Sequence, residues 1–208
     1  MSLASSLWIG REKLVLASKS AGRRRLLEGA GLPFEVDPAD LDERALEDTR
    51  IARGESGETL AATLARAKAL AVSARWPGAP CLGADQTLTL DGKPLHKSDT
   101  PEEAARTLVA LSGRFHKLTS AFALARDGRL LDEDQDSAEL TMRPLDARRI
   151  DLYLACAGPA ALASVGVYQV EGLGQHLFER IEGDHTTIVG LPMLKLLACL
   201  RRQGLLAL

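Results

Sequence analysis

The sequence has few aromatic residues and no large excess of charge of either sign. Aromatic side chains make up 4% of its 208 residues, and 26 Lys and Arg stand against 28 Asp and Glu, which gives a formal net charge of -2. A protein that grips a nucleic-acid backbone needs a broad basic field, and one that stacks single-stranded bases needs aromatic platforms. The composition therefore predicts a protein that does not bind nucleic acid.

Cysteine is also scarce, and no apolar run is long. Cys81, Cys156 and Cys199 lie far apart and form no C-x-x-C pair, which is typical of reduced thiols in a cytoplasmic protein. A membrane-spanning helix needs about 20 consecutive apolar residues, and no stretch approaches that length. The first residues lack the basic segment and apolar run of a signal peptide. We expect a cytoplasmic protein with no membrane partner.

Several catalytic and nucleotide-binding patterns are missing as well. The histidines form no H-x-x-x-H or H-E-x-x-H pair, so no zinc site is predicted. The sequence has no G-x-x-x-x-G-K-[ST] loop, and the glycines that follow Glu171 do not complete a G-x-G-x-x-G pattern. These absences argue against a P-loop and against a Rossmann-type dinucleotide site.

Strand and helix patterns alternate along the chain, with a hairpin in the middle. Apolar residues recur at helical spacing over residues 57–74, and Thr100-Pro101-Glu102-Glu103 carries the cap, proline and glutamate of a helix start. This order predicts an α/β fold with a mixed sheet, in one domain over 1–208 with its core at 12–204. Asp40-Leu41-Asp42-Glu43 is expected to be an acidic turn. The expected strands are 13–17, 34–37, 81–90, 115–125, 130–142 and 177–181, and the expected helices are 20–30, 57–74, 100–112, 146–157 and one from 192 onward.

The segment that follows the first strand is suited to binding phosphate. Leu14-Val15-Leu16 runs into the small-residue turn Ala17-Ser18-Lys19-Ser20, and this turn opens a helix that carries Arg23-Arg24-Arg25. Free backbone N–H groups and the dipole favour an anion at a helix N-terminus, and guanidinium groups bind phosphate oxygens in bidentate fashion. The alternative is that Ser20 is an ordinary N-cap and that the arginines form a solvated helix face.

A carboxylate within a buried strand marks a second candidate site. Asp85 lies in the strand-like run Gly83-Ala84-Asp85-Gln86-Thr87, where an unpaired charge is costly. A metal ion or a catalytic water would supply the missing partner. Lys68 and Lys97 would neutralise phosphate charge if the fold brings them to the same cleft. The alternatives are a buried Asp bonded to backbone N–H groups and two solvated lysines.

A glycine-rich segment, Tyr168-Gln169-Val170-Glu171-Gly172-Leu173-Gly174, marks a third candidate site. Glycines allow the backbone to approach a ligand closely, and Glu171 can accept hydrogen bonds from the edge of a base. The alternative is an acid on an ordinary surface loop. The first of the three candidate sites favours a small phosphate-containing substrate, and the third would suit the edge of a base.

These motifs, in this order, resemble those of the Maf family of nucleoside triphosphate pyrophosphatases. The resemblance extends from about residue 14 to about residue 201, and it implies a two-lobed α/β fold around a twisted mixed sheet, with the active cleft between the lobes. It also implies cleavage of a nucleoside triphosphate to the monophosphate and pyrophosphate with Mg²⁺ or Mn²⁺, and a homodimer. The matching motifs are Ala17-Ser18-x-Ser20-x-x-Arg23 with Leu26-Leu27, Leu64-Ala65-x-x-Lys68-Ala69, Gly83-Ala84-Asp85-Gln86, Lys97, Leu111-Ser112-Gly113, Glu171-Gly172-x-Gly174 and Gly190-Leu191-Pro192.

The resemblance also assigns roles to individual residues. Asp85 is implied to be the catalytic carboxylate, and Asp85 and Glu43 the metal-side acids. The positions that match the family's phosphate-binding residues are Ser18, Ser20, Arg23, Lys68 and Lys97.

The three positions at which the family's substrate branches differ are occupied here by Gly22, Gln86 and Glu171. Gln86 and Glu171 match the branch that resembles 7-methyl-GTP pyrophosphatases, whereas Gly22 matches neither that branch nor the dTTP/UTP branch. A glutamate suits 7-methylguanine, because it accepts from the N1–H and N2–H donors and offsets the positive ring. A dTTP/UTP pyrophosphatase, a sugar-nucleotide hydrolase and a non-catalytic nucleotide-binding regulator of septum formation are the alternatives.

Overall fold

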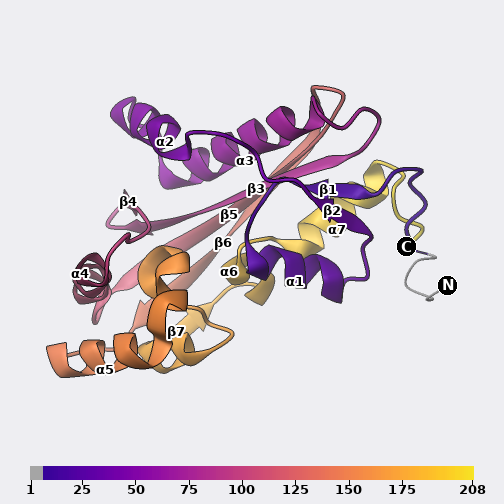
Figure 1. Cartoon of the computed structure of the whole chain (residues 1–208). Coiled ribbons are helices and arrows are strands. Elements are labelled where there is room, and N and C mark those ends of the chain that lie inside the picture. The colour runs from indigo at the N-terminus through magenta and orange to yellow at the C-terminus, as the bar shows by residue number, and fades with distance from the viewer. Residues whose placement is uncertain (1–6) are drawn as a thin grey trace.

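The computed structural model describes residues 7–208, apart from the side chains of residues 160 and 163. Over this range the chain forms one mixed β-sheet with helices on both faces (Figure 1). The order along the sheet is β2-β1-β3-β5-β6-β7, and β4 pairs with β3 beside this path. The strands are β1 (Leu14–Leu16), β2 (Phe34–Val36), β3 (Cys81–Leu90), β4 (Lys93–Leu95), β5 (Phe115–Arg126), β6 (Arg129–Met142) and β7 (Phe178–Glu182).

The sheet is parallel near the N-terminus and antiparallel elsewhere. β1 pairs in parallel with β2 and β3, whereas β3, β5, β6 and β7 pair antiparallel in succession. The helices are α1 (Ala21–Gly29), α2 (Glu43–Ala52), α3 (Gly57–Ser73), α4 (Pro101–Leu111), α5 (Ala147–Ala157), α6 (His185–Val189) and α7 (Met193–Arg202), with short 3₁₀ helices at Gly158–Ala163, Val165–Val167 and Leu173–Leu177. The predicted mixed α/β sheet is confirmed. Within residues 7–208, no helix is both long and apolar enough to cross a membrane.

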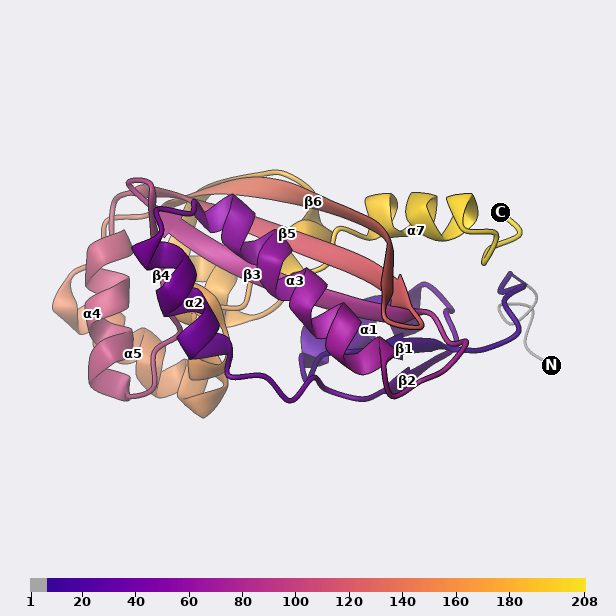
Figure 2. The ribbon, with the colours of Figure 1, turned by 90° about the horizontal axis from the view of Figure 1, so that it is seen from above.

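Alternating side chains on β5 separate the two faces of the sheet. Ala121, Ala123 and Ala125 pack against alanines of α3, whereas Phe122 and Leu124 belong to an apolar cluster that includes residues of α7. Figure 2 shows α3 lying diagonally across the long strands. The period of two along a strand explains this division, because successive side chains point to opposite faces.

Two large apolar clusters divide the core into lobes. One includes Leu88 of β3 with residues of α4 and α5, and the other includes Leu82 of β3 with residues of β1, α1 and α7. Asp85 lies on β3 between Leu82 and Leu88. β3 therefore carries the charged residue Asp85 at the boundary between the two lobes.

A close approach between α3 and β3 brings Lys68 next to Asp85. A Cβ atom at Gly83 would lie 2.0 Å from the carbonyl oxygen of Ala65 and 2.5 Å from the amide nitrogen of Ala69, so only glycine fits there. The alanines on this face of α3 and the bare backbone of Gly83 let helix and strand touch. Lys68 then extends beside Asp85, which is two residues from Gly83 on the same face of the strand.

The acidic turn expected at Asp40-Leu41-Asp42-Glu43 is wrong in its second half. Asp42 caps a helix by accepting a hydrogen bond from the Ala45 amide, and Glu43 is the first residue of α2. No residue of α2 is buried. Its half-buried face is mostly polar, with Glu43, Glu47 and Arg50 beside Leu46 and Ile51, so apolar spacing marks this helix only weakly.

Candidate active site

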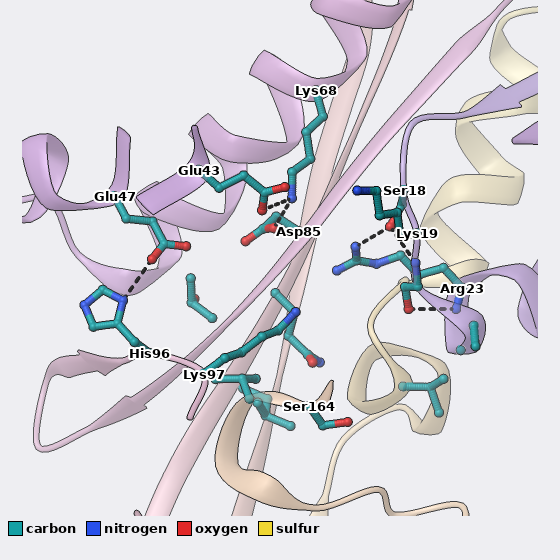
Figure 3. Close-up of a pocket in the computed structure, with 18 of the residues that line it drawn as sticks. Ser18, Lys19, Arg23, Glu43, Glu47, Lys68, Asp85, His96, Lys97 and Ser164 are labelled. Carbon is teal, nitrogen blue, oxygen red and sulfur yellow. Dashed lines mark hydrogen bonds and ion pairs between the residues drawn. The ribbon is translucent and has the colours of Figure 1, made fainter. Parts of the chain in front are cut away.

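A cleft of about 740 Å³ opens between the lobes. Its walls come from the turn before α1, the start of α2, α3, β3, the segment after β4, residues 164–171 and α6. Figure 3 shows Glu43, Lys68 and Asp85 on one side and Ser18, Lys19 and Arg23 on another, with Lys97 between them and Ser164. All the sequence-predicted site residues, Ser18, Ser20, Gly22, Arg23, Glu43, Lys68, Asp85, Gln86, Lys97 and Glu171, line this cleft.

Lys68 holds two carboxylates together. Its Nζ lies 2.6 Å from Oδ1 of Asp85 and 2.7 Å from Oε2 of Glu43. Lys68 and Asp85 are 5% and 8% exposed, whereas the Glu43 side chain is 45% exposed. In the described part of the chain, Oδ2 of Asp85 carries no hydrogen bond. A buried carboxylate with one oxygen fixed and the other free can take up a proton in a defined position.

Arg23 is bonded mainly to the protein itself. Its Nε donates to the Gly190 carbonyl at 2.8 Å, and its Nη1 donates to Ser18 Oγ and to the Ala84 carbonyl, both at 2.9 Å. Burial lowers the pKa of the guanidinium, and the charges of Asp85 and Glu43 oppose this effect. Arg23 therefore ties α1 to β3 and to the segment after α6, in addition to any contact with a ligand.

The turn before α1 takes the form that the sequence predicts. Ser20 is the N-cap of α1 and accepts from the Arg23 amide at 3.3 Å, while the Ser20 amide donates to Ser18 Oγ at 3.3 Å. Ser20 is thus an N-cap, which the sequence left open as the alternative to phosphate binding, and it also lines the cleft. Of the three arginines that follow, Arg23 and Arg25 line the cleft, whereas Arg24 is exposed and does not.

Lys97 differs from Lys68 in its surroundings. It is exposed in the segment after β4, and within residues 7–208 it makes no ion pair or side-chain hydrogen bond. A free ammonium group on the wall of a cleft is available to an anionic ligand.

Gln86 and Glu171 are held in different ways. The Nε2 of Gln86 lies within 3.1 Å of the carbonyl oxygens of Thr187 and Ile188 and of Ser120 Oγ. This fixes the amide and leaves its carbonyl oxygen as an acceptor. Glu171 pairs instead with Arg25, whose Nη2 lies 2.7 Å from Oε1.

Sequence reasoning missed several side chains on the cleft wall. Nδ1 of His96 lies 2.9 Å from Oε2 of Glu47, and this contact joins α2 to the segment that carries Lys97. Glu43 and Glu47 are four residues apart and share a face of α2. If α2 had been predicted as a helix, the four-residue spacing would have placed Glu43 and Glu47 on the same face.

A metal ion is implied by the family resemblance, and the residues here fit one kind of site. Among residues 7–208, no three His, Cys, Asp or Glu side chains come together to hold a metal. Two carboxylates, Glu43 and Asp85, do converge on Lys68. Mg²⁺ in phosphoryl-transfer sites takes one or two protein carboxylates, with substrate phosphates and water as the other ligands. The donor set therefore fits a divalent cation that is shared with a phosphate-bearing ligand.

Fold and cleft together define an α/β protein with a solvent-open, charge-lined site between two lobes. A family model described as Maf-like protein matches residues 13–203. A nucleoside triphosphate pyrophosphatase of Nitrobacter winogradskyi is 52% identical over 203 residues, 98% of this chain and 100% of that protein. A 7-methyl-GTP pyrophosphatase of Mesorhizobium japonicum is 54% identical over 193 residues, 93% of this chain and 97% of that protein. The chain belongs to the Maf family.

Among solved structures, a nucleoside-triphosphatase/dITP/XTP pyrophosphatase from Mycobacterium abscessus aligns with a TM-score of 0.41 at 17% identity. The alignment covers 93% of this chain and 96% of that one.

Proposed function

We propose that this Maf-type nucleoside triphosphate pyrophosphatase acts on 7-methyl-GTP or a closely similar modified nucleotide, and that Asp85 is its catalytic base. One observation carries the proposal: Lys68 joins Asp85 and Glu43 in the cleft that also receives the Ser18–Ser20 turn. Carboxylates that hold a cation, next to hydroxyl and amide donors at a helix N-terminus, suit a polyphosphate that carries its own divalent ion.

In the proposed reaction, water attacks the α-phosphorus. The new bond joins the water oxygen to the α-phosphorus, and the bond from that phosphorus to the bridging oxygen of the β-phosphate breaks. The water proton passes to Oδ2 of Asp85, and pyrophosphate leaves with the bridging electron pair. Lys68 holds Oδ1, so the accepting oxygen has a fixed orientation.

The cationic side chains stabilise the charge on the leaving group. Lys68 and Lys97 lie on the cleft wall, and Arg23 donates a hydrogen bond to Ser18 Oγ. The hydroxyls of Ser18 and Ser20 are further donors. Such preorganised donors act where charge develops during phosphoryl transfer. A divalent cation, Mg²⁺ or Mn²⁺, held by Asp85, Glu43 and the substrate phosphates would neutralise phosphate charge.

The proposed base preference rests on two acceptors. Gln86 and Glu171 line the cleft, and the Gln86 amide is held through its Nε2, which leaves its carbonyl oxygen as an acceptor. The edge of 7-methylguanine presents N1–H and N2–H donors, and its ring carries a positive charge. The relative from Mesorhizobium japonicum, named a 7-methyl-GTP pyrophosphatase, supports this preference at 54% identity.

Pyrophosphate release from a panel of nucleotides tests the proposal. The purified protein is supplied with Mg²⁺ or Mn²⁺ and with 7-methyl-GTP, GTP, dTTP, UTP or CTP. The highest kcat/KM is expected for 7-methyl-GTP. Faster cleavage of dTTP or UTP would overturn the base assignment and leave the reaction in place.

Two other outcomes would overturn the proposed reaction as well as the base assignment. Tight nucleotide binding without release of pyrophosphate from any of the five would favour a non-catalytic regulator. A sugar nucleotide releases no pyrophosphate on cleavage, so it is assayed separately by release of the nucleoside monophosphate. Faster cleavage of it than of any triphosphate would identify a different phosphohydrolase.

A further inference from the structure

Arg25 and Glu171 form an ion pair across the cleft wall. Nη2 of Arg25 lies 2.7 Å from Oε1 of Glu171, and the two side chains are 58% and 30% exposed. The pair spans 146 residues of sequence and joins α1 to the segment that follows Tyr168. Both residues line the cleft, so a ligand that reaches Glu171 also meets Arg25.

The position of Arg25 on α1 follows from helix geometry. It lies three residues after Gly22, and residues three apart share a face of a helix. Gly22 gives only backbone to that face, where a Cβ atom would lie 3.0 Å from Val189 Cγ1. Arg25 is therefore the next side chain that this face of α1 presents to the cleft, whereas its neighbour Arg24 is exposed and does not line it.

We propose that Arg25 is a specificity-determining residue, because it offsets the charge of Glu171 and so sets how much negative charge the cleft presents to a base. This inference rests on the proposed function, in which Glu171 faces the base. With the pair intact, Glu171 contributes hydrogen-bond acceptors but little net charge. The enzyme then distinguishes cationic 7-methylguanine from neutral guanine less sharply than a bare carboxylate would.

Replacement of Arg25 by a neutral side chain should sharpen this preference. In Arg25→Gln, the charge of Glu171 is no longer offset, and a cationic ring gains attraction that a neutral ring does not. The pair is half exposed and screened by water and salt, so a change of about five-fold is expected in the ratio of kcat/KM for 7-methyl-GTP to that for GTP. The change should shrink at high ionic strength.

The matched control is Arg24→Gln. It removes the same charge from the adjacent position of the same helix, outside the cleft. The ratio should rise in Arg25→Gln and stay at the wild-type value in Arg24→Gln. An unchanged ratio in Arg25→Gln, an equal rise in both variants, or an equal fall in kcat/KM for both nucleotides would overturn the proposal. The last outcome would assign Arg25 to the phosphates instead.

A second pair of variants tests whether Arg25 acts through Glu171. Glu171→Gln should lower the ratio, and adding Arg25→Gln to it should then have much less effect than in the wild type. Equal effects of Arg25→Gln in the two backgrounds would show that the residues act independently.

Failure of the proposed function would look different from failure of this inference. If the wild type cleaves neither 7-methyl-GTP nor GTP, the proposed function fails. The ratio of dissociation constants for 7-methyl-GMP and GMP, measured by calorimetry, then tests Arg25 without turnover. In Arg25→Gln the dissociation constant for 7-methyl-GMP divided by that for GMP should fall about five-fold, because tighter binding lowers a dissociation constant. An unchanged ratio overturns the inference.

Discussion

Two groups of charged residues in the cleft are held in opposite ways. The buried group, Arg23, Lys68 and Asp85, is bonded to partners on other elements and is at most 8% exposed. The exposed group, Arg25, Lys97 and Glu171, has either one partner near the surface or none within residues 7–208. The protein thus fixes the buried charges before a ligand arrives and leaves the exposed charges adjustable. Buried charges should govern turnover and folding together, whereas exposed charges should govern substrate preference and affinity.

The largest expected effect comes from Asp85→Asn. The amide has nearly the shape of the carboxylate but cannot accept the water proton, so turnover should fall by about a thousand-fold. Pyrophosphate release measures this effect, and thermal unfolding checks that the fold remains. Asp91→Asn, in the exposed turn after β3 and outside the cleft, is the control. Near-normal turnover in Asp85→Asn would remove Asp85 from the catalytic role.

Arg23→Lys should disrupt the hydrogen bonds within the buried group, whereas Asp85→Asn removes its proton acceptor. A lysine cannot reproduce the three hydrogen bonds from Nε and Nη1, and each unsatisfied buried carbonyl costs about 1–3 kcal/mol. We expect a loss of about 2–4 kcal/mol in the free energy of unfolding and a fall of about a hundred-fold in kcat/KM. Urea unfolding and steady-state kinetics measure the two. Full stability with full activity would contradict the account of a tie between α1, β3 and the segment after α6. Arg24→Lys, outside the cleft, is the matched control.

The serine turn and Asp85 could be predicted from local pattern. An apolar strand, a small-residue turn and a capped helix predict the Ser18–Ser20 site, because each signal lies within a few residues. Asp85 was recognisable because an acid within an apolar strand needs a partner. Its actual partner, Lys68, depends on the contact between Gly83 and the alanines of α3, which no local pattern reveals.

Three other features of the cleft leave little or no signal in the sequence, and each has a physical reason. The inner face of α2 is only half-buried and mostly polar, so apolar spacing marks the helix weakly, and Glu43 is expected in a turn. Two of the three acceptors of Arg23 are backbone carbonyls, which leave no trace in residue types. The pair of Arg25 and Glu171 joins residues 146 apart, and charged surface residues offer many equally plausible partners.

Hydrogen bonds of two buried tyrosines, Tyr153 and Tyr168, hold the segment that precedes Glu171. Tyr168 Oη lies 2.7 Å from Nε2 of His116, and Tyr153 donates to the Val167 carbonyl at 3.0 Å. Val167 has φ of 65°, a strained value for a β-branched residue. Burial lowers the pKa of His116 to about 4. The segment that carries Glu171 is therefore bonded, through Tyr168, to a histidine that folding keeps neutral.

This support predicts a loss of stability in acid. Between pH 6.5 and pH 4 the unfolded chain binds a proton on His116 that the folded chain does not, so stability falls as the pH falls. From pH 7 to pH 5, this residue should lower the free energy of unfolding by about 2 kcal/mol. Urea unfolding at both pH values measures it, and His116→Gln should reduce the pH-dependent loss by that amount. The exposed His176→Gln should not, and equal losses in the two variants would contradict the assignment.

The sharpest contrast with the buried group comes from Lys97→Ala, which should affect activity but not stability. Lys97 makes no ion pair or side-chain hydrogen bond within residues 7–208, so its loss leaves no buried group unsatisfied, and the melting temperature should not change. An exposed ammonium beside a phosphate still contributes to binding, so kcat/KM should fall by about ten-fold, and less at high salt. Lys93→Ala, four residues earlier in β4 and outside the cleft, removes the same charge and should leave kcat/KM unchanged. A fall in melting temperature with Lys97→Ala would mean that the exposed charge is structural. Equal falls in kcat/KM for Lys97→Ala and Lys93→Ala would mean that only the overall charge of residues 93–97 matters. A ten-fold fall confined to Lys97 would show that the cleft uses a free exposed cation beside its fixed buried ones.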